Sequence, residues 1–301
     1  MKKYIIIILM IILAVSLYSC GQTDENVFYQ NTNVVTDAGD ITTDISDTFN
    51  YDENDSGQEI QVDKSKIVIS DEAKFSEYES WFPPVPPNSY AVTKTQTYDE
   101  KWIRVYAAYY PKFTDEIKYA GSDAIKQYYA QKVEKDKEYI NSDEWGIGDT
   151  VIDELFDYYY YDYSTYDTKF FGKYLSVRYF DAWYGGGIHG EEFYTVDNFD
   201  METGKLLTLN DLFGNEEMYR PILQELICKN LMLQYTEETF FMNPYKNSDI
   251  MNYIDNSRFR ITDGGIEFIF QEYEIACYAA GTIFVIVPYD ELSDILQIQI
   301  N

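Results

Sequence analysis

The chain has 301 residues, with 52 acidic against 23 basic side chains, so its formal net charge is −29. A surface this negative repels phosphate, which argues against nucleic acid as a partner and against docking onto anionic lipid through a basic patch. His189 is the only histidine, so one copy of the chain cannot supply two histidine ligands to a metal. No metal or other cofactor is expected.

The N-terminus has the layout of a secretory signal peptide. Two lysines precede an apolar run over residues 4–17, which is shorter than the roughly 20 residues of a membrane-spanning helix. The run ends in Leu17-Tyr18-Ser19-Cys20-Gly21, which resembles a bacterial lipobox. We therefore expect a signal peptide over residues 1–19 and a lipidated Cys20. The chain would then be exported and anchored to the outer face of the bacterial cytoplasmic membrane. An uncleaved anchor with an incidental cysteine is the alternative.

An acidic tether is expected next. Residues 21–63 contain eleven acidic side chains and no lysine or arginine. Their scattered apolar residues cannot offset the entropy of ordering, so the segment is predicted to be disordered and extended by charge repulsion. Residues 52–63 partly match a calcium-binding loop, but their flanks do not look helical, and an acidic linker is favoured. With a strand at 66–69 and a proline-rich spacer, the tether runs over residues 20–89.

The hydrophobic pattern after residue 89 predicts strands grouped around separate helices. Strands are expected at 90–98, 101–110, 153–166, 174–183, 192–199, 258–262, 266–271 and 282–288, and helices at 122–140, 216–235, 248–255 and 289–296. Ser122 is the expected N-cap of the first helix, and Lys132 and Asp136 are expected to pair on its exposed face. Because hairpins link most strands, we predict an α+β fold with mostly antiparallel sheets and two long helices.

A run of three glycines, residues 185–187, lies just before His189 and the pair Glu191-Glu192. Glycine lets the backbone turn tightly and approach a ligand, and a histidine beside carboxylates is a candidate acid–base pair. A turn whose histidine hydrogen-bonds the backbone explains the pattern by geometry alone, and it is favoured. The candidate binding residues are Tyr184, Gly186, Gly187, His189, Gly190 and Glu191. No catalytic or metal-ligating residue is assigned.

Several spaced motifs resemble the RsiV-type extracellular domain, in the order found in that family. They are Tyr184-Gly185-Gly186-Gly187-Ile188-His189-Gly190, Asn198-Phe199-Asp200-Met201-Glu202-Thr203-Gly204-Lys205, Leu209-Asn210-Asp211-Leu212-Phe213, Phe270-Gln271-Glu272-Tyr273-Glu274-Ile275-Ala276-Cys277-Tyr278-Ala279-Ala280-Gly281 and Val287-Pro288-Tyr289-Asp290-Glu291-Leu292. Upstream, Tyr109-Tyr110-Pro111-Lys112-Phe113 resembles the smaller PdaC/RsiV-type domain that usually precedes it. The resemblance implies a small α+β domain over residues 90–165 and a larger RsiV-type domain over residues 166–301.

The family includes the anti-sigma factor RsiV, which senses lysozyme by binding it, and the accessory region of the peptidoglycan deacetylase PdaC. The resemblance therefore implies an envelope location and binding to lysozyme or cell-wall glycan. Sigma-factor control is not implied, because only three residues precede the apolar run. The single histidine cannot rebuild the metal site of a deacetylase. Cys277 stands where the family often has proline.

The favoured function is a non-catalytic lipoprotein whose acidic, tyrosine-rich head binds a protein or glycan at the cell envelope, with lysozyme and peptidoglycan as candidates. An acidic head attracts a cationic protein. A carboxylate-dependent hydrolase acting on peptidoglycan is the alternative. The sequence leaves open the true ligand, the oligomeric state and whether Cys228 and Cys277 form a disulfide. A small buried thiol at Cys228 is the favoured interpretation.

Overall fold

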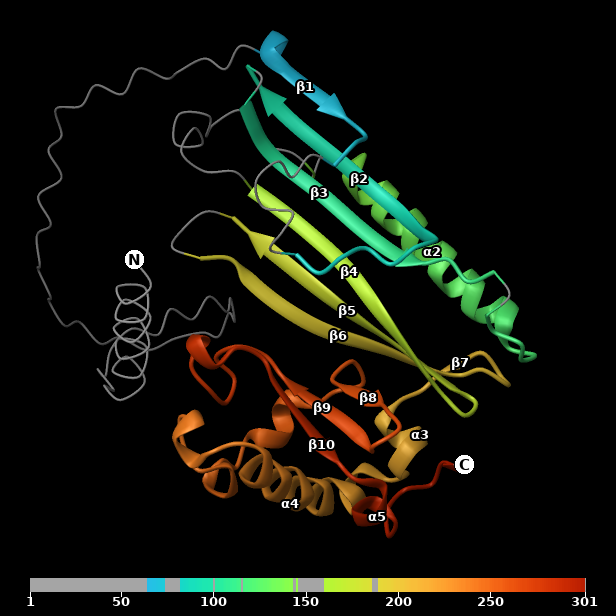
Figure 1. Ribbon diagram of the computed structural model, residues 1–301, viewed down its shortest axis with the longest axis vertical. Coiled ribbons are helices and arrows are strands. Elements are labelled where there is room, and N and C mark those ends of the chain that lie inside the picture. The colour runs from blue at the N-terminus through green and yellow to red at the C-terminus, as the bar shows by residue number, and fades with distance from the viewer. Residues whose placement is uncertain are drawn as a thin grey trace, which may run out of the picture. The chain divides into compact units, whose positions relative to one another are not determined.

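A computed structural model describes residues 64–73, 82–99, 101–114, 116–142, 145, 160–185 and 189–300. Residues Gln61–Asn301 form one compact unit with two β-sheets (Figure 1). The expected signal peptide, the lipidated Cys20, the tether up to residue 63 and two of the candidate glycines, Gly186 and Gly187, lie outside the described residues.

A large mixed sheet carries its strands in sequence order. The strands are β1 (Ile67–Ser70), β2 (Ser89–Tyr98), β3 (Lys101–Pro111), β4 (Tyr160–Phe171), β5 (Tyr174–Tyr184), β6 (Glu191–Asp200) and β7 (Lys205–Leu206). Every neighbouring pair is antiparallel except β3 and β4, which are parallel and are connected through α2 (Ser122–Ile140). A parallel pair needs such a crossover. The predicted α+β class with mostly antiparallel pairing is confirmed.

The domain boundaries expected after residues 89 and 165 both fall inside the compact unit. The second lies within β4, which pairs with β3 on one side and with β5 on the other. The sheet therefore runs across the expected boundary, and the two-domain division stays a prediction.

Helix α2 covers one face of the large sheet (Figure 1). Its Ile125 and Tyr129 are fully buried and pack with Leu175, Val177 and Phe199 of β5 and β6. The bounds predicted for this helix are confirmed. Its apolar positions recur at helical spacing, so one stripe of the helix can be buried while the other side stays in water.

Two local predictions for α2 are wrong. The N-cap position is Gly121, which makes no side-chain cap, and Ser122 is the first helical residue. Lys132 does not pair with Asp136: its Nζ lies 2.8 Å from Asp197 Oδ2 on β6. Asp136 instead accepts hydrogen bonds from two tyrosine hydroxyls of β3. Both side chains point toward the sheet, where tertiary partners replace the helical neighbour.

The second sheet has the strand order β10-β9-β8 and is antiparallel. Its strands are β8 (Phe259–Ile261), β9 (Ile266–Phe270) and β10 (Ile283–Val287), and the helices α3 (Leu209–Phe213), α4 (Glu216–Gln234) and α5 (Tyr289–Leu292) belong to the same part of the chain. The predicted short helix near residue 250 is a 3-10 turn, Ile250–Tyr253. This sheet lies between the large sheet and α4 (Figure 1). Phe259, Phe268 and Phe270 are fully buried in its core.

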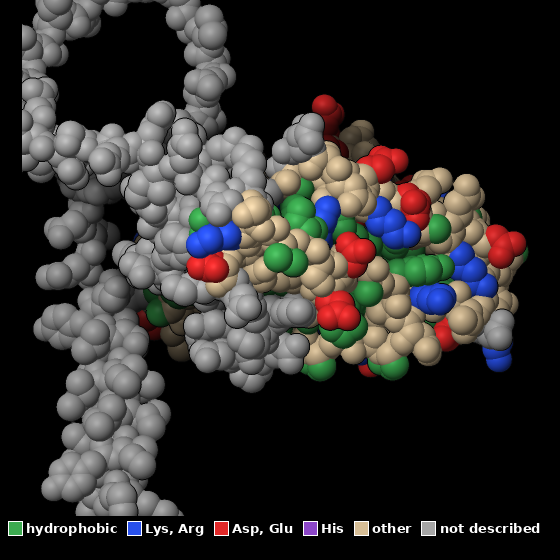
Figure 2. Space-filling model, turned by 90° about the horizontal axis from the view of Figure 1, so that it is seen from above, with side chains coloured by type: hydrophobic (Ala, Val, Ile, Leu, Met, Phe, Trp, Pro, Cys, Tyr) green, Lys and Arg blue, Asp and Glu red, His purple; other side chains and the backbone are tan. Residues whose placement is uncertain are grey.

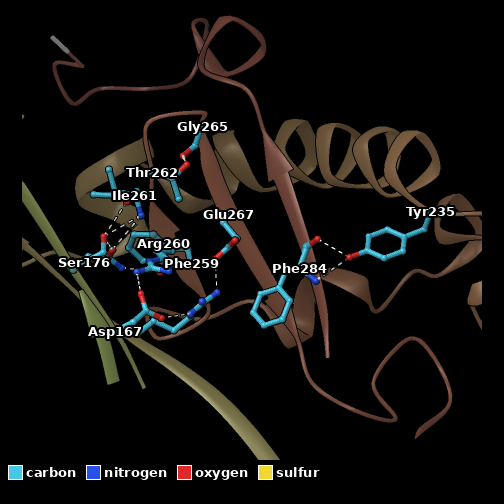
Figure 3. Close-up of polar contacts among 12 residues, drawn as sticks. Asp167, Ser176, Tyr235, Phe259, Arg260, Ile261, Thr262, Gly265, Glu267 and Phe284 are labelled. Atoms are coloured by element: carbon cyan, nitrogen blue, oxygen red, sulfur yellow. Dashed lines mark hydrogen bonds and ion pairs between the residues drawn. The ribbon is translucent and has the colours of Figure 1, made fainter. Parts of the chain in front are cut away.

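A buried polar junction joins β8 to β5 and β6 (Figure 3). Ser176 Oγ donates to Asn198 Oδ1 at 2.6 Å, and Asn198 Nδ2 donates to the Phe259 carbonyl at 2.8 Å. The Ile261 amide lies 3.2 Å from Ser176 Oγ and 3.3 Å from Asn198 Oδ1. Asn198 is fully buried. A buried polar group costs stability unless it is paired, so this set of bonds holds the two sheets in one relative position.

Charged side chains continue this contact toward solvent (Figure 3). Arg260 of β8 is buried and pairs with Asp167 of β4. Arg178 of β5 pairs with the same carboxylate at 2.9 Å and with Glu267 of β9 at 3.3 Å. Removing one partner of a buried pair leaves an uncompensated charge, so the network also opposes sliding of the sheets.

Replacing Asn198 with alanine tests the junction. Asn198→Ala removes the side-chain donor to the buried Phe259 carbonyl and one of the two side-chain acceptors of the Ile261 amide. We therefore expect the free energy of unfolding to fall by about 2–4 kcal/mol. Urea unfolding measures the change. Asn252→Ala, which removes an exposed amide bonded to Arg220, should cost less than about 1 kcal/mol. Equal losses in the two variants would contradict the assigned role.

Candidate functional site

Three aromatic rings meet at one end of the large sheet. His189 lies in the turn between β5 and β6, and Tyr273 and Tyr278 lie in the loop between β9 and β10. The His189 ring is stacked on Tyr278, with centroids 4.2 Å apart and planes 24° apart. Tyr273 stacks at 6.4 Å from His189 and at 5.8 Å from Tyr278. We call these three residues the aromatic stack. Its members come from two motifs that are more than 80 residues apart.

Hydrogen bonds fix the imidazole within the aromatic stack. His189 Nδ1 lies 2.9 Å from the Gly190 carbonyl oxygen, which can only accept. Its Nε2 lies 3.4 Å from the Tyr273 hydroxyl. The favoured interpretation of the glycine turn, a histidine that hydrogen-bonds the backbone, agrees with this geometry. The stacking against tyrosines of another loop could not be read from the turn alone.

Tyr273 has a strained backbone. Its φ is +65°, in the left-handed region that non-glycine residues seldom adopt. Its side chain is nevertheless 55% exposed, so burial of the ring does not explain the strain. Sparsely populated conformations persist where the surroundings hold them, and they gather at binding sites. The strain orients an aromatic ring on the surface beside His189.

A buried glutamine ties the Tyr273 loop to the large sheet. Gln271 donates from Nε2 to the Tyr194 carbonyl at 2.6 Å and accepts from the Tyr194 amide at 3.0 Å. The Gln271 side chain thereby bonds both the backbone C=O and the backbone N–H of Tyr194 in β6, as a neighbouring strand would. The backbone N–H of Gln271 donates to Glu274 at 2.7 Å, and Glu274 pairs with Arg258 at 3.1 Å. The loop is therefore held against β6 two residues before Tyr273.

A stacked pair of tyrosines from β4 and β5 lies beside Gly190. Tyr161 stacks on Tyr184 with centroids 5.9 Å apart. A Cβ at Gly190 would lie 2.8 Å from the Tyr161 hydroxyl oxygen and 2.9 Å from the Trp183 carbonyl oxygen. Glycine at 190 is thus required by close approach. Two of the predicted site residues, Tyr184 and Gly190, thus both contact Tyr161, and the Gly190 carbonyl oxygen is the hydrogen-bond partner of His189.

Two glutamates border the aromatic stack. Burial raises the pKa of Glu192 above its ordinary value. Burial raises the pKa of Glu272 too, with further contributions from the charges of Glu192 and Glu191, while His189 acts in the opposite direction. The same carboxylates help to raise the pKa of the Tyr278 hydroxyl, after burial. None of the three glutamates forms an ion pair with another residue in the described ranges. A cationic group placed here would meet carboxylates that have no ion-pair partner in the described part of the chain.

The strand alternation separates two neighbouring acids that the sequence groups together. Glu191 pairs in register with Trp183, and Glu192 pairs with Ala182. Successive side chains of a strand point to opposite faces, so only Glu192 shares the face of Tyr184 and Tyr194. Sequence reasoning selected Glu191 and left out Glu192, Glu272, Tyr273 and Tyr278. All four lie within or beside the family motifs, but nothing in a linear sequence shows which motif residues meet.

Basic side chains are interspersed with acidic ones on the face seen from above in Figure 2. Several bases are engaged in ion pairs, for example Lys132 with Asp197 and Lys173 with Asp200. Several carboxylates therefore have a basic partner, whereas others, such as Glu192 and Glu272, have none among the described residues. Cys228 is a free, buried thiol whose pKa burial raises to about 11, so it is not joined to Cys277.

Neither a metal site nor a membrane span is found in the described part of the chain. No group of three or more histidine, cysteine, aspartate or glutamate side chains there has the geometry to hold a metal ion. No helix among the described residues is long and apolar enough to cross a membrane.

Comparison with known proteins identifies the C-terminal part. Residues 210–290 match the family described as "Protein of unknown function (DUF3298)". No curated protein matches the chain. Among solved structures, a DUF3298 family member from Bacteroides fragilis is 20% identical, with a TM-score of 0.48 over 70% of this chain and 92% of that one. A DUF3298 family protein from Pseudomonas aeruginosa PAO1 is 16% identical, with a TM-score of 0.47 over 71% and 95%. The family match confirms the predicted resemblance over residues 210–290, and the smaller domain expected upstream stays a prediction.

The single histidine offers a direct probe of the Gln271 clamp. Gln271→Ala should free the loop from β6 and separate Tyr278 from His189. The upfield shifts that a stacked ring causes in the imidazole proton resonances should then be lost in ¹H NMR spectra. Gln127→Ala, at an exposed position of α2, should leave them unchanged. Unaltered imidazole shifts in Gln271→Ala would show that the clamp does not position the stack.

The raised pKa values predict a stability change with a definite sign. Because the native Glu272 carboxyl keeps its proton to higher pH than the unfolded one, its ionisation costs stability as pH rises from about 4.5 through the folded pKa. Glu272→Gln should therefore raise Tm at pH 7, and the gain should vanish below that window.

Glu291→Gln is the control of opposite sign. Hydrogen bonds from Lys229 and Asn230 lower the pKa of Glu291, so its charged form contributes stability that is lost as pH falls through the folded pKa. This variant should lower Tm at pH 7. Thermal unfolding at pH 7 and pH 4 measures both, and a lower Tm of Glu272→Gln at pH 7 would contradict the prediction.

Proposed function

We propose that this chain is a ligand-binding protein of the bacterial envelope. The premise is that residues 210–290 form a DUF3298 domain, the domain shared with RsiV and PdaC. It is exported, lipidated at Cys20 and held at the outer face of the cytoplasmic membrane. Its head binds a protein or glycan at the aromatic stack and the neighbouring glutamates, without catalysis. The layout of residues 1–21 supports the export and the anchor.

One observation carries the binding function. An exposed aromatic surface, held by a strained backbone at Tyr273, lies beside the carboxylates of Glu192 and Glu272, which have no ion-pair partner in the described part of the chain. Aromatic rings at a surface gain energy by covering their faces, and unpaired carboxylates gain energy by meeting a cation. A partner that supplies cationic and flat apolar groups together satisfies both requirements.

The charge favours a cationic protein over a neutral glycan. A net charge of −29 attracts a basic protein over the distance of a Debye length, about 8 Å at physiological salt. A neutral sugar would gain only from the rings. Lysozyme is therefore the first candidate, with a cell-wall glycan as the second.

Calorimetric titration with lysozyme tests the proposal. We expect binding that weakens as salt rises, because exposed charges are screened. Tyr278→Ala and Glu272→Gln should each raise the Kd by about tenfold or more, as expected of residues in the centre of an interface. The matched controls are Tyr245→Ala and Glu225→Gln, at exposed positions away from the stack, which should bind as the unchanged protein does.

Absence of binding at low and at high salt would contradict the lysozyme version, and a parallel titration with cell-wall oligosaccharides then tests the glycan. One observation favours a second function: burial and the neighbouring charge of Glu192 raise the pKa of Glu272, and a carboxyl with a raised pKa beside a second carboxyl suits the general acid of a glycoside hydrolase. Release of reducing sugar from cell wall, abolished in Glu192→Gln, would establish a hydrolase in place of a non-catalytic binder.

A further inference from the structure

A pocket lies on the face of the large sheet that α2 covers in part, opposite to the face of Glu192. Its volume is about 160 Å³, and its lining includes Tyr106, Ala108, Asp162, Ser164, Asp181 and Trp183, from β3, β4 and β5. The strand register places these residues side by side: Tyr106 faces Asp162 across the parallel pair, and Ser164 and Asp162 face Asp181 and Trp183. Small side chains at Ala108 and Ser164 leave room between the acids and the indole.

The carboxylates around this pocket differ in their partners. Asp162 pairs with Arg104 at 3.0 Å. Asp136 of α2 accepts from the Tyr106 hydroxyl at 2.7 Å. Asp181 makes no ion pair with any residue that the structure describes. Burial raises the pKa of Asp181, and a hydrogen bond from Ser164 and the charge of Lys132 act in the opposite direction without reversing the shift. A half-buried carboxylate without an ion-pair partner costs stability that a bound cation would return.

Trp183 forms an exposed wall beside this carboxylate. It is 45% exposed, which is unusual for the largest apolar side chain. Its position depends on Gly185, where a Cβ would lie only 2.4 Å from a carbon of the indole ring. The close approach of Gly185 gives the ring a defined place on the surface. An indole face beside a carboxylate is the arrangement that binds a cation most strongly among aromatic surfaces.

The same sheet face contains a filled counterpart of this arrangement. Lys132 Nζ lies 2.8 Å from Asp197 Oδ2, and it stands over the rings of Tyr179 at 4.7 Å and Tyr128 at 5.1 Å. One carboxylate and aromatic walls there enclose a lysine ammonium from the chain itself. At Asp181 the carboxylate and the aromatic wall are present, Lys132 acts on the carboxylate only through its charge, and no lysine among the described residues forms an ion pair with it.

We propose that the pocket between Asp181 and Trp183 binds a primary alkylammonium group, such as a lysine side chain presented by another molecule. The ammonium donates to Asp181 and to the Ser164 hydroxyl, and its alkyl chain lies along the indole. The pocket is separate from the aromatic stack, because the side chains that line it near the sheet end point to the opposite face from Glu192. The proposal therefore does not depend on the function proposed for that stack.

A small probe tests the proposal on the whole protein. Nα-acetyl-lysine amide is titrated against Nα-acetyl-norleucine amide, which has the alkyl chain without the ammonium. The indole N–H resonance of Trp183, assigned with Trp183→Phe, reports on binding by NMR. We expect the lysine probe to shift this resonance to saturation and the norleucine probe to leave it in place.

Charge-matched variants identify the carboxylate. Asp181→Asn should weaken binding of the lysine probe by about tenfold or more, whereas Asp294→Asn, at an exposed site outside the pocket, should not. His189→Ala should bind the lysine probe as the unchanged protein does. Ligand-observed NMR on Trp183→Leu, which removes the aromatic wall, gives a second variant and should also show weaker binding.

Four results would overturn the proposal. The first is no saturable shift with the lysine probe. The second is equal shifts with the norleucine probe, which would identify a merely apolar pocket. The third is unaltered affinity in a folded Asp181→Asn protein. Tighter binding of Nα-acetyl-arginine amide than of the lysine probe would overturn the assignment of an alkylammonium in favour of a guanidinium.

Discussion

The buried polar junction between the two sheets is the contact on which the rest of this structure depends. Asn198, with Ser176, bonds the backbone of β8, and the ion pairs of Arg260 and Arg178 extend the contact toward solvent. Apolar packing alone would allow the small sheet to slide over the large one, because the hydrophobic effect has no direction. Directional bonds in a dry interface remove that freedom. The loop after β9 therefore reaches the end of β6 at one fixed place.

The aromatic stack is a consequence of that placement. Gln271 bonds the backbone of β6 as a neighbouring strand would, and Glu274 links the Gln271 backbone to Arg258. Tyr273, two residues after Gln271, adopts an unfavourable positive φ. Gln271, Glu274 and Arg258 need not contact a ligand themselves. Their combined effect is that two tyrosines of one segment stack with the histidine of another, beside carboxylates that have no ion-pair partner among the described residues. The strain at Tyr273 and the unpaired charges are local costs that the surrounding fold offsets.

Periodic segments of the chain were predictable, and isolated side-chain partners were not. The bounds of α2 and the short hairpin across Asp263 follow from local pattern, since one helical stripe or one turn suffices to specify them. The partner of Lys132 does not follow, because Asp197 comes from a strand 65 residues away. The two-residue strand β7 is too short to give a pattern. The pleat, which no composition reveals, decides that Glu192 and not Glu191 shares the sheet face of Tyr184 and Tyr194.

The sequence by itself determined the charge of this protein, its single histidine, its α+β class and the family motifs on which the resemblance rests. Those properties are sums or local patterns, which a linear chain already contains. Tertiary structure decided which motif residues share a surface: it brought His189 to Tyr278 and placed Glu192 and Glu272 together. It also left Asp181, in the pocket beside Trp183, without an ion-pair partner in the described part of the chain. Such contacts depend on strand register and on the direction of each side chain, and both are fixed only when the sheets pack.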